Sequence, residues 1–319
     1  MSIEGRRQEF LSPPPLSLRP DATARRHGMS VDVEDYYHAW AITSAIGKAA
    51  WQAWPSRVAD NTRRIMDLFE SRDIKATFFT LGWVAEREPS LVRDIVARGH
   101  ELASHGYGHD KIHELTPEAF RADVLKTRLL LEDLGGVAVK GYRAPSFSID
   151  KRCLWAYDVL AEAGYGYSSS LHPISHDHYG MPDAPLAPFR PGGGALLEIP
   201  VATIDFLGRR FSCAGGGHFR IYPYHWSRFC LNKLEADTDR TGVFYLHPWE
   251  IDRNQPRIPG LPLRSRVRHY TGQQRMEAKL AKLLDERRWD RIDRLFDFTA
   301  MPTAGATAHL FEAQKEEAA

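Results

Sequence analysis

Segments typical of β-strands alternate with segments typical of helices along most of this 319-residue chain. The predicted strands cover residues 29–34, 76–82, 100–106, 141–147, 165–171, 195–204 and 242–251. The predicted helices cover residues 55–71, 89–98, 117–134, 153–163, 273–284 and 289–296. This alternation predicts parallel strands joined by crossover helices, which fold either as an open doubly wound sheet or as a barrel.

The first strand argues against a dinucleotide-binding sheet, because that fold carries a glycine-rich fingerprint directly after its first strand. The first predicted strand ends instead in three acids, Asp32, Glu34 and Asp35. Gly-Gly-Gly runs occur later, at residues 192–194 and 215–217. Neither is predicted to open a helix after a strand, so we interpret both as loops.

The composition is that of an ordinary globular protein, with 43% hydrophobic residues, 26% charged residues and a formal net charge of +1. A nearly neutral chain without a basic block argues against a nucleic-acid partner. The three cysteines, Cys153, Cys213 and Cys230, form no CxxC pair. They therefore argue against a disulfide framework and a thiolate zinc site, and they indicate a reducing compartment.

Both ends of the chain are expected to lie outside the fold. Residues 1–28 are polar, include three consecutive prolines and lack the apolar core of a signal peptide, so we expect a disordered leader. Residues 29–300 are predicted to form one barrel, with its own helical segment at about 252–300, and residues 301–319 a flexible tail. No apolar run approaches the roughly 18 residues that span a bilayer, so we expect a cytoplasmic protein without a transmembrane segment.

Polar side chains collect at the ends of the predicted strands. Because the carboxyl ends of parallel strands form one rim of a barrel, where active sites are found, we expect them to converge. The acids also need a cation among them, since like charges this close raise one another's pKa. The set comprises Asp32, Glu34, Asp35, His105, His109, Arg143 and His247.

His105 and His109 lie four residues apart in the glycine-flanked sequence SHGYGH. Two imidazoles in such a turn can bind one cation, because histidine is the commonest ligand of zinc-like ions. The alternative is a pair of solvated loop histidines. A neighbouring acid cluster favours the metal site, since two histidines and one carboxylate leave positions for water and substrate, as in catalytic sites.

Arg143 and His247 each allow a structural and a catalytic interpretation. Arg143 follows a strand and precedes Pro145, so a rigid turn holds its guanidinium at the rim, where it suits a carboxylate kept ionised as a base. A surface ion pair is the alternative. His247 follows an apolar strand and suits a general acid. It could equally be a buried, hydrogen-bonded histidine.

Four motifs resemble, in order and spacing, those of the NodB-homology polysaccharide deacetylases, carbohydrate esterase family 4. They are SVDVED (30–35), SHGYGH (104–109), GYRAPSF (141–147) and YLHPW (245–249), and the resemblance covers residues 29–251. The longer forms VDVEDYYH, RFSCAGGGHFRIYPY and YLHPWEID are more similar still to the subgroup encoded with exopolysaccharide and exosortase (PEP-CTERM, XrtA-type) loci. The family implies a distorted (β/α) TIM-like barrel of about seven strands, a divalent metal and hydrolysis of N-acetyl groups.

The resemblance also implies a role for individual residues. Asp32 matches the catalytic base, Arg143 the arginine that orients this base, and His247 the general acid. His105 and His109 match the metal histidines. These roles agree with the chemistry that each residue type suggests by itself.

The resemblance identifies the carboxylate that would bind the metal less directly. The family's first motif has adjacent aspartates, whereas Val33 follows Asp32 here and two further acids come later. Glu34 is favoured as the ligand, because positions two apart on a strand share a face. Asp35 is the alternative, because it lies in the turn.

Three further residues are expected to contact the substrate or the oxyanion. Ser146 and Phe147 would do so through backbone N–H groups, and Tyr107 lies between the metal histidines. The family's YDSS sequence is YSSS here, at residues 167–170, so an acid that usually supports the site is missing.

These expectations describe an enzyme of exopolysaccharide biosynthesis that acts on an N-acetylated poly- or oligosaccharide. Zinc is the default metal, and cobalt, nickel and iron suit the same ligands. Two other functions remain open: another amide (C–N) hydrolase on the same fold, and a non-catalytic glycan-binding protein.

Overall fold

The computed structural model describes residues 26–43, 45–176, 179–237 and 240–298. Its main sheet has eight strands, seven of them in the order β10-β1-β2-β3-β4-β5-β6, while β9 also pairs with β1. Neighbouring strands of this sheet are parallel. The strands are β1 (Arg26–Val33), β2 (Thr77–Thr80), β3 (Glu101–Ser104), β4 (Gly141–Tyr142), β5 (Tyr167–Ser168), β6 (Leu197–Glu198), β9 (Val243–Leu246) and β10 (Arg288–Asp290).

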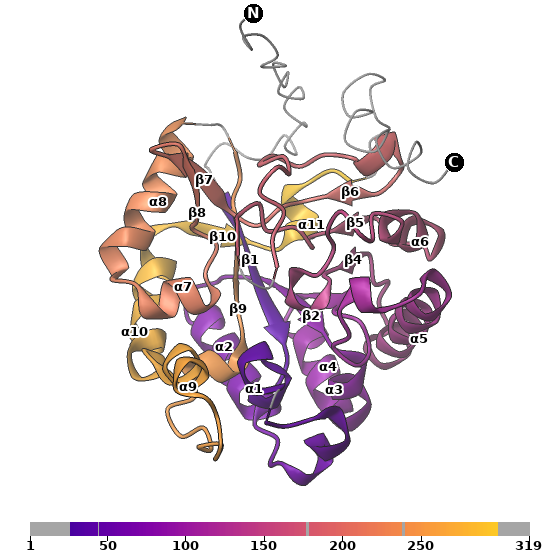
Figure 1. The fold of residues 1–319 in the computed structure, drawn as a ribbon, viewed down its shortest axis with the longest axis horizontal. Coiled ribbons are helices and arrows are strands. Elements are labelled where there is room, and N and C mark those ends of the chain that lie inside the picture. The colour runs from indigo at the N-terminus through magenta and orange to yellow at the C-terminus, as the bar shows by residue number, and fades with distance from the viewer. Residues whose placement is uncertain (1–25, 44, 177–178, 238–239, 299–319) are drawn as a thin grey trace, which may run out of the picture.

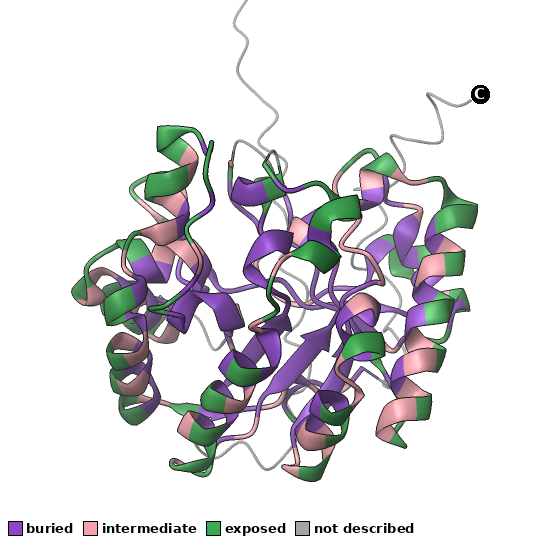
Figure 2. Cartoon of the chain, turned by 90° about the horizontal axis from the view of Figure 1, so that it is seen from below, coloured by how far each residue is buried: buried purple, intermediate pink, exposed green. Residues whose placement is uncertain are grey.

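The sheet curls into a half-barrel with helices on its outside, which confirms the predicted barrel class (Figure 1). The outward faces of these helices are exposed, whereas the strands are buried (Figure 2). None of the helices that the structure describes is long and apolar enough to cross a membrane. The helices are α1 (Trp40–Thr43), α2 (Val58–Glu70), α3 (Gly82–Arg87), α4 (Pro89–Ala97), α5 (Pro117–Gly135), α6 (Ala156–Glu162), α7 (Gly216–Ile221), α8 (Tyr224–Asp237), α9 (Leu263–Tyr270), α10 (Gln273–Glu286) and α11 (Ile292–Leu295).

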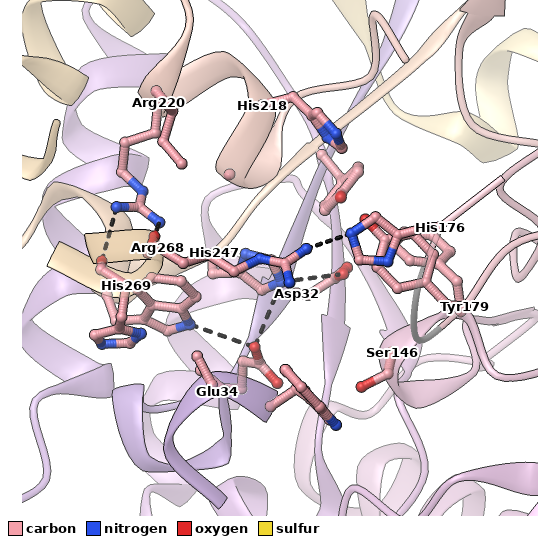
Figure 3. A pocket seen from close by; sticks show the side chains of 18 of the residues that line it. Asp32, Glu34, Ser146, His176, Tyr179, His218, Arg220, His247, Arg268 and His269 are labelled. Carbon is pink, nitrogen blue, oxygen red and sulfur yellow. Dashed lines mark hydrogen bonds and ion pairs between the residues drawn. The ribbon is translucent and has the colours of Figure 1, made fainter. Parts of the chain in front are cut away.

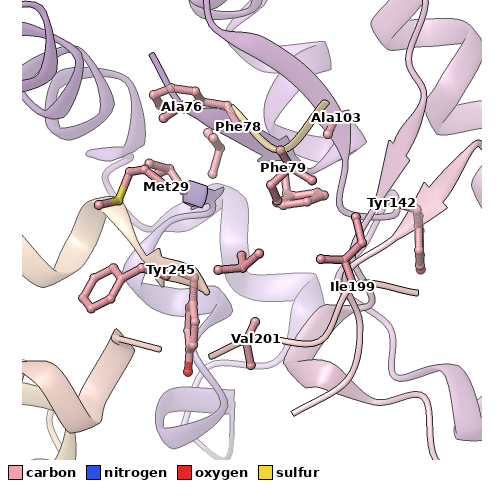
Figure 4. Packing of buried hydrophobic residues seen from close by; sticks show 14 of the residues in the cluster. Met29, Ala76, Phe78, Phe79, Ala103, Tyr142, Ile199, Val201 and Tyr245 are labelled. Carbon is pink, nitrogen blue, oxygen red and sulfur yellow. The ribbon is translucent and has the colours of Figure 1, made fainter. Parts of the chain in front are cut away.

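The core lies where the strands meet one another and the surrounding helices (Figure 4). All four residues of β2 and of β9 are buried, as expected for strands covered on both faces. Met29, Phe78, Phe79 and Tyr245 pack together in this core. The apolar runs of the sequence therefore supply both the strands and the packing that holds them.

The ends of α5 agree with their sequence signals. The Thr116 hydroxyl accepts a hydrogen bond from the N–H of Ala119 at 3.2 Å, which caps the first turn. Pro117 follows in the first helical position. Gly136 ends the helix with a φ of 64°, a left-handed conformation that glycine adopts without strain.

The first strand begins earlier than the sequence predicts. β1 starts at Arg26, so residues 26–28 of the predicted leader belong to the sheet, where they pair with β10. The rest of that leader and the predicted tail lie outside the described residues. β10 itself is unexpected, because the predicted helix over 289–296 is a strand up to Asp290 and a helix only from Ile292.

The single strand predicted over residues 195–204 is wrong. β6 ends at Glu198, and Pro200, which has no N–H to donate to a ladder, lies in the break that follows. Thr203 begins β7 (Thr203–Phe206), which pairs antiparallel with β8 (Arg209–Ser212) in a separate sheet. Two short strands of different sheets thus produce one continuous β-type pattern.

The loop predicted at residues 215–217 is also wrong, because Gly216 begins α7. Gly215 has a φ of 108° and forms a bridge to Tyr245 of β9. A Cβ atom on Gly215 would lie 2.1 Å from the Tyr245 carbonyl oxygen. The glycines therefore let the start of α7 approach β9 closely, which brings this helix to the end of the strand that precedes His247.

His100, just before β3, links the starts of two strands at the end of the barrel opposite the polar rim. Its Nδ1 accepts a hydrogen bond from the N–H of Ala76 at 3.1 Å, and its ring packs against Phe78. Burial, assisted by the positive charges of Lys75 and Arg98, lowers the pKa of His100 from 6.5 to about 3. The native state thus binds fewer protons than the unfolded chain between these pH values, and its stability is lost as the pH falls below 6.5.

We expect acidification to destabilise the wild-type protein more than a His100→Asn variant, whose amide oxygen can still accept the Ala76 hydrogen bond. His100 accounts for about 2 kcal/mol of the stability lost between pH 7 and pH 5. Denaturant unfolding of both proteins at the two pH values measures this difference. An equal loss in both proteins would contradict the assigned role.

Candidate active site

The polar residues at the strand ends converge on one rim, as the parallel sheet requires (Figure 3). Asp32 and Glu34 come from the end of β1, and His105 follows β3 directly. Arg143 follows β4, and His247 follows β9. A cavity of about 950 Å³ opens above this rim. Predicted site residues that line it are Asp32, Glu34, His105, His109, Ser146, Phe147 and His247.

Asp32 and Arg143 form a buried ion pair. The Arg143 Nη1 donates to Asp32 Oδ1 at 2.7 Å and to the Ser30 hydroxyl at 2.8 Å. Its Nε donates to the Ser169 carbonyl at 2.9 Å, and its Nη2 to the Ser169 hydroxyl at 3.0 Å. Arg143 is completely buried and Asp32 is 2% exposed, so the guanidinium fixes one carboxylate oxygen and balances its charge. The other oxygen, Oδ2, lies 3.9 Å from His247 Nε2.

Glu34, His105 and His109 form a group that could hold a metal ion. One ligand atom from each lies within 4.8 Å of the others, and Glu34 Oε2 is 2.8 Å from His109 Nε2. His105 Nδ1 lies 2.9 Å from the carbonyl oxygen of Arg143. Because a carbonyl only accepts, Nδ1 carries the proton and Nε2 presents a lone pair, the arrangement found in metal-binding histidines. The donor set, one carboxylate and two imidazoles, fits zinc and similar cations.

The protonation states of these groups also suit a cation. Burial would raise the pKa of Glu34, but the neighbouring His109 and His247 hold it well below its usual range. Burial lowers the pKa of His105 to about 4, despite the opposing effect of Asp32. Glu34 is therefore ionised and His105 neutral near pH 7, as metal ligands must be.

Asp35, the alternative ligand, points away from the cluster. Its Oδ1 accepts from the N–H of Tyr36 at 3.0 Å. Its Oδ2 accepts from the Ser56 hydroxyl at 2.9 Å and from the N–H of Arg57 at 2.8 Å and of Val58 at 3.2 Å. Burial raises its pKa, although these hydrogen bonds oppose the rise. Asp35 thus accepts hydrogen bonds from its neighbour Tyr36 and from residues 56–58 at the start of α2, and it does not face His105 and His109.

His247 belongs to a buried chain of charged groups that the sequence did not reveal. Its Nδ1 lies 3.2 Å from Glu250 Oε2, and Arg220 Nε donates to Glu250 Oε1 at 3.2 Å. Burial would lower the pKa of His247, but Glu34, Glu250 and Asp32 raise it to about 9. The three-residue spacing of the HPWE sequence could have suggested Glu250, whereas no local signal pointed to Arg220.

The three residues predicted to contact the oxyanion or the substrate differ in their position and hydrogen bonds. Ser146 lines the cavity and has a φ of 55°. Phe147 also lines it, but its N–H already donates to the Ala144 carbonyl at 3.0 Å, so it is not available to an oxyanion as predicted. Tyr107 is not among the described residues that line the cavity, and its hydroxyl donates to Glu86 at 2.7 Å.

The YSSS segment supports the site without the acid that its sequence lacks. Ser169 provides two of the acceptors of Arg143. The Ser170 hydroxyl accepts from the N–H of Ala144 at 2.9 Å. Glu198, from β6, accepts from the N–H groups of Ser170 and Leu171 at 2.8 and 2.9 Å. A carboxylate distant in the sequence therefore fixes this segment.

Comparison with known families divides the chain into two matched segments. Residues 45–168 match the polysaccharide deacetylase family, and residues 169–297 match a domain of unknown function (DUF3473). The first segment contains His105, His109 and Arg143, whereas Asp32 precedes it and His247 lies in the second.

Related proteins carry deacetylase names. A peptidoglycan-N-acetylglucosamine deacetylase of Bacillus cereus is 34% identical over 96 residues, which cover 30% of this chain and 35% of that protein. A chitooligosaccharide deacetylase of Bradyrhizobium is 26% identical over 144 residues, 43% of this chain and 64% of that protein. The chain thus spans less than two thirds of the length of each.

A solved structure from Mycobacterium smegmatis, provisionally named a polysaccharide deacetylase, shares the fold. It covers 95% of this chain and 96% of its own, with a TM-score of 0.57 and 20% identity. The chain is thus similar to polysaccharide deacetylases over residues 45–168, and its fold is that of the Mycobacterium smegmatis structure.

The two candidate carboxylates can be separated by substitution. We expect Glu34→Gln to weaken metal binding at least tenfold, because a neutral amide replaces an anionic donor. Asp35→Asn should keep stoichiometric metal but lower the free energy of unfolding by about 1–3 kcal/mol, since it disturbs a buried acceptor of four hydrogen bonds. Metal content after dialysis and denaturant unfolding measure the two effects. Loss of metal from the Asp35 variant alone would reverse the assignment.

Proposed function

We propose that this protein is a divalent-metal-dependent hydrolase that removes N-acetyl groups from the amino sugars of a polysaccharide or of its oligosaccharide precursor. One observation carries the proposal: a buried Asp32–Arg143 pair adjoins the Glu34, His105 and His109 group in a cavity that His247 also lines. The deacetylase names of the relatives agree with it. We also propose that the metal is zinc and that the protein acts in exopolysaccharide biosynthesis, as in the XrtA-type subgroup.

Each group has a task that its surroundings suit. A divalent cation held by Glu34, His105 and His109 would supply Lewis acidity toward the acetyl carbonyl and the attacking water. Asp32, held in place by Arg143, accepts the proton of the water through its Oδ2.

The leaving group and the developing negative charge also meet residues of this chain. His247, protonated beside Glu250 and Glu34, donates its proton to the departing amine, so acetate and a free amino sugar result. The Ser146 N–H is the backbone donor that we assign to the oxyanion, since the Phe147 N–H is engaged in a turn.

Acetate release tests the proposal. Zinc-loaded protein is incubated with N-acetylglucosamine oligosaccharides, and free acetate is quantified. We expect Asp32→Asn to lower the rate by about 10²–10⁴-fold, because it removes the proton acceptor. Asp285→Asn, a change of the same kind at an exposed carboxylate on α10, should keep the wild-type rate.

Two results would oppose this function. One is a zinc-loaded wild-type protein that frees no acetate from any N-acetylated oligosaccharide while still binding it, which favours a glycan-binding protein. The other is an Asp32→Asn variant that keeps the full rate. Circular dichroism of the variants excludes loss of the fold as the cause of a lower rate.

A further inference from the structure

The cavity extends well beyond the catalytic cluster, toward a wall built from the segment matched to the domain of unknown function. This wall consists of α7, α9, His176 and Tyr179, all of which line the cavity. The volume of the cavity, about 950 Å³, lies near the upper end of the range for ligand pockets. There is therefore room for chemical groups besides the reacting acetamide, and the wall must contact them.

The wall carries cationic and imidazole side chains (Figure 3). Arg264 and Arg268 lie one turn apart on α9, and both line the cavity, as do His176 and His218. The carboxylates among the described lining residues are Asp32 and Glu34, which belong to the catalytic cluster. Among the residues that the structure describes, the side of the cavity away from that cluster therefore presents arginine and imidazole groups and no carboxylate, although the chain as a whole has a net charge of only +1.

Another arginine of the same wall has a different task. Arg220 is buried, pairs with Glu250 and donates to the carbonyl oxygens of Arg268 and His269 at 2.9 and 2.7 Å. It therefore fixes the end of α9 through backbone contacts, and its charge is balanced by Glu250. These contacts leave the Arg268 side chain free to point into the cavity from a rigid backbone.

The surroundings of Arg268 suit an anion. Its guanidinium contacts the Nε2 of His176, a ring nitrogen rather than a carboxylate oxygen, and the His176 ring stacks on Tyr179 with centroids 4.0 Å apart. Burial and the nearby charge of Arg268 lower the pKa of His218. An oxyanion placed here would pair with the guanidinium fork of Arg268.

We infer that this wall, centred on Arg268, binds an acidic group of the glycan, a carboxylate or a phosphate, beside the N-acetylated sugar. The inference rests on the proposed function and names its substrate class: an anionic amino-sugar glycan rather than a neutral one. The catalytic cluster performs the deacetylation, and Arg268 determines which glycans are held in the cavity.

Three probes test the inference: a neutral N-acetylglucosamine tetrasaccharide, a hyaluronan tetrasaccharide that carries uronate carboxylates, and N-acetylglucosamine 1-phosphate. We expect zinc-loaded wild-type protein to prefer one acidic probe at least tenfold in kcat/KM. The preferred probe identifies carboxylate or phosphate as the group bound. Arg268→Ala should abolish this preference and change kcat/KM for the neutral probe less than twofold.

Arg266→Ala is the matched control, because Arg266 lies on the same helix but lines a separate pocket with Leu261 and Tyr270. It should behave as wild type toward all three probes. Arg268→Lys, which keeps the charge but not the planar fork, should restore part of the preference. Equal use of acidic and neutral probes by the wild type, or equal slowing of both by Arg268→Ala, overturns the inference while deacetylation stands.

Calorimetric binding to the Asp32→Asn protein separates the two proposals. Tenfold weaker binding of the preferred acidic probe when Arg268→Ala is added supports the inference, even if no probe ever yields acetate. Failure of every acidic probe to bind overturns the inference, whatever the activity toward the neutral probe.

Discussion

The hydrogen bonds of one buried guanidinium hold the active-site rim together. Arg143 has no exposed surface, and its donors reach Ser30 and Asp32 on β1 and Ser169 just beyond β5. Its own carbonyl oxygen fixes the ring of His105. Removing one partner of a buried ion pair leaves an uncompensated charge, which costs about 3–5 kcal/mol. The orientation of the proposed base and that of a proposed metal ligand therefore depend on the same side chain.

The fold and the convergence of the polar residues at one rim could be predicted because their signals are local. Alternating apolar runs and caps such as Thr116 indicate the elements, and parallel strands must deliver residues such as Asp32 and His105 to one rim. Asp35 shows the limit of this reasoning, because sequence position alone did not reveal which acid faces the histidines. The backbone N–H groups of Arg57 and Val58, distant in the sequence, determine its direction.

The features that were missed depend on contacts between distant segments. Gly215 looks like a loop residue until β9 approaches it, and the short β10 is a strand only because β1 is available to pair with it. Glu250 and Arg220 form an ion pair in the structure, although they lie 30 positions apart in the sequence. Nothing in the local sequence of either residue indicates that the two form a buried pair.

The acceptors around Arg143 also bear on how such chains diversify. The family match begins at residue 45 and ends at residue 168, yet the acceptor side chains and carbonyl of this arginine belong to Ser30, Asp32 and Ser169. The segment matched to polysaccharide deacetylases therefore carries a charge that Asp32, outside this segment, balances. Recombination between relatives at those borders would separate the arginine from its acceptors.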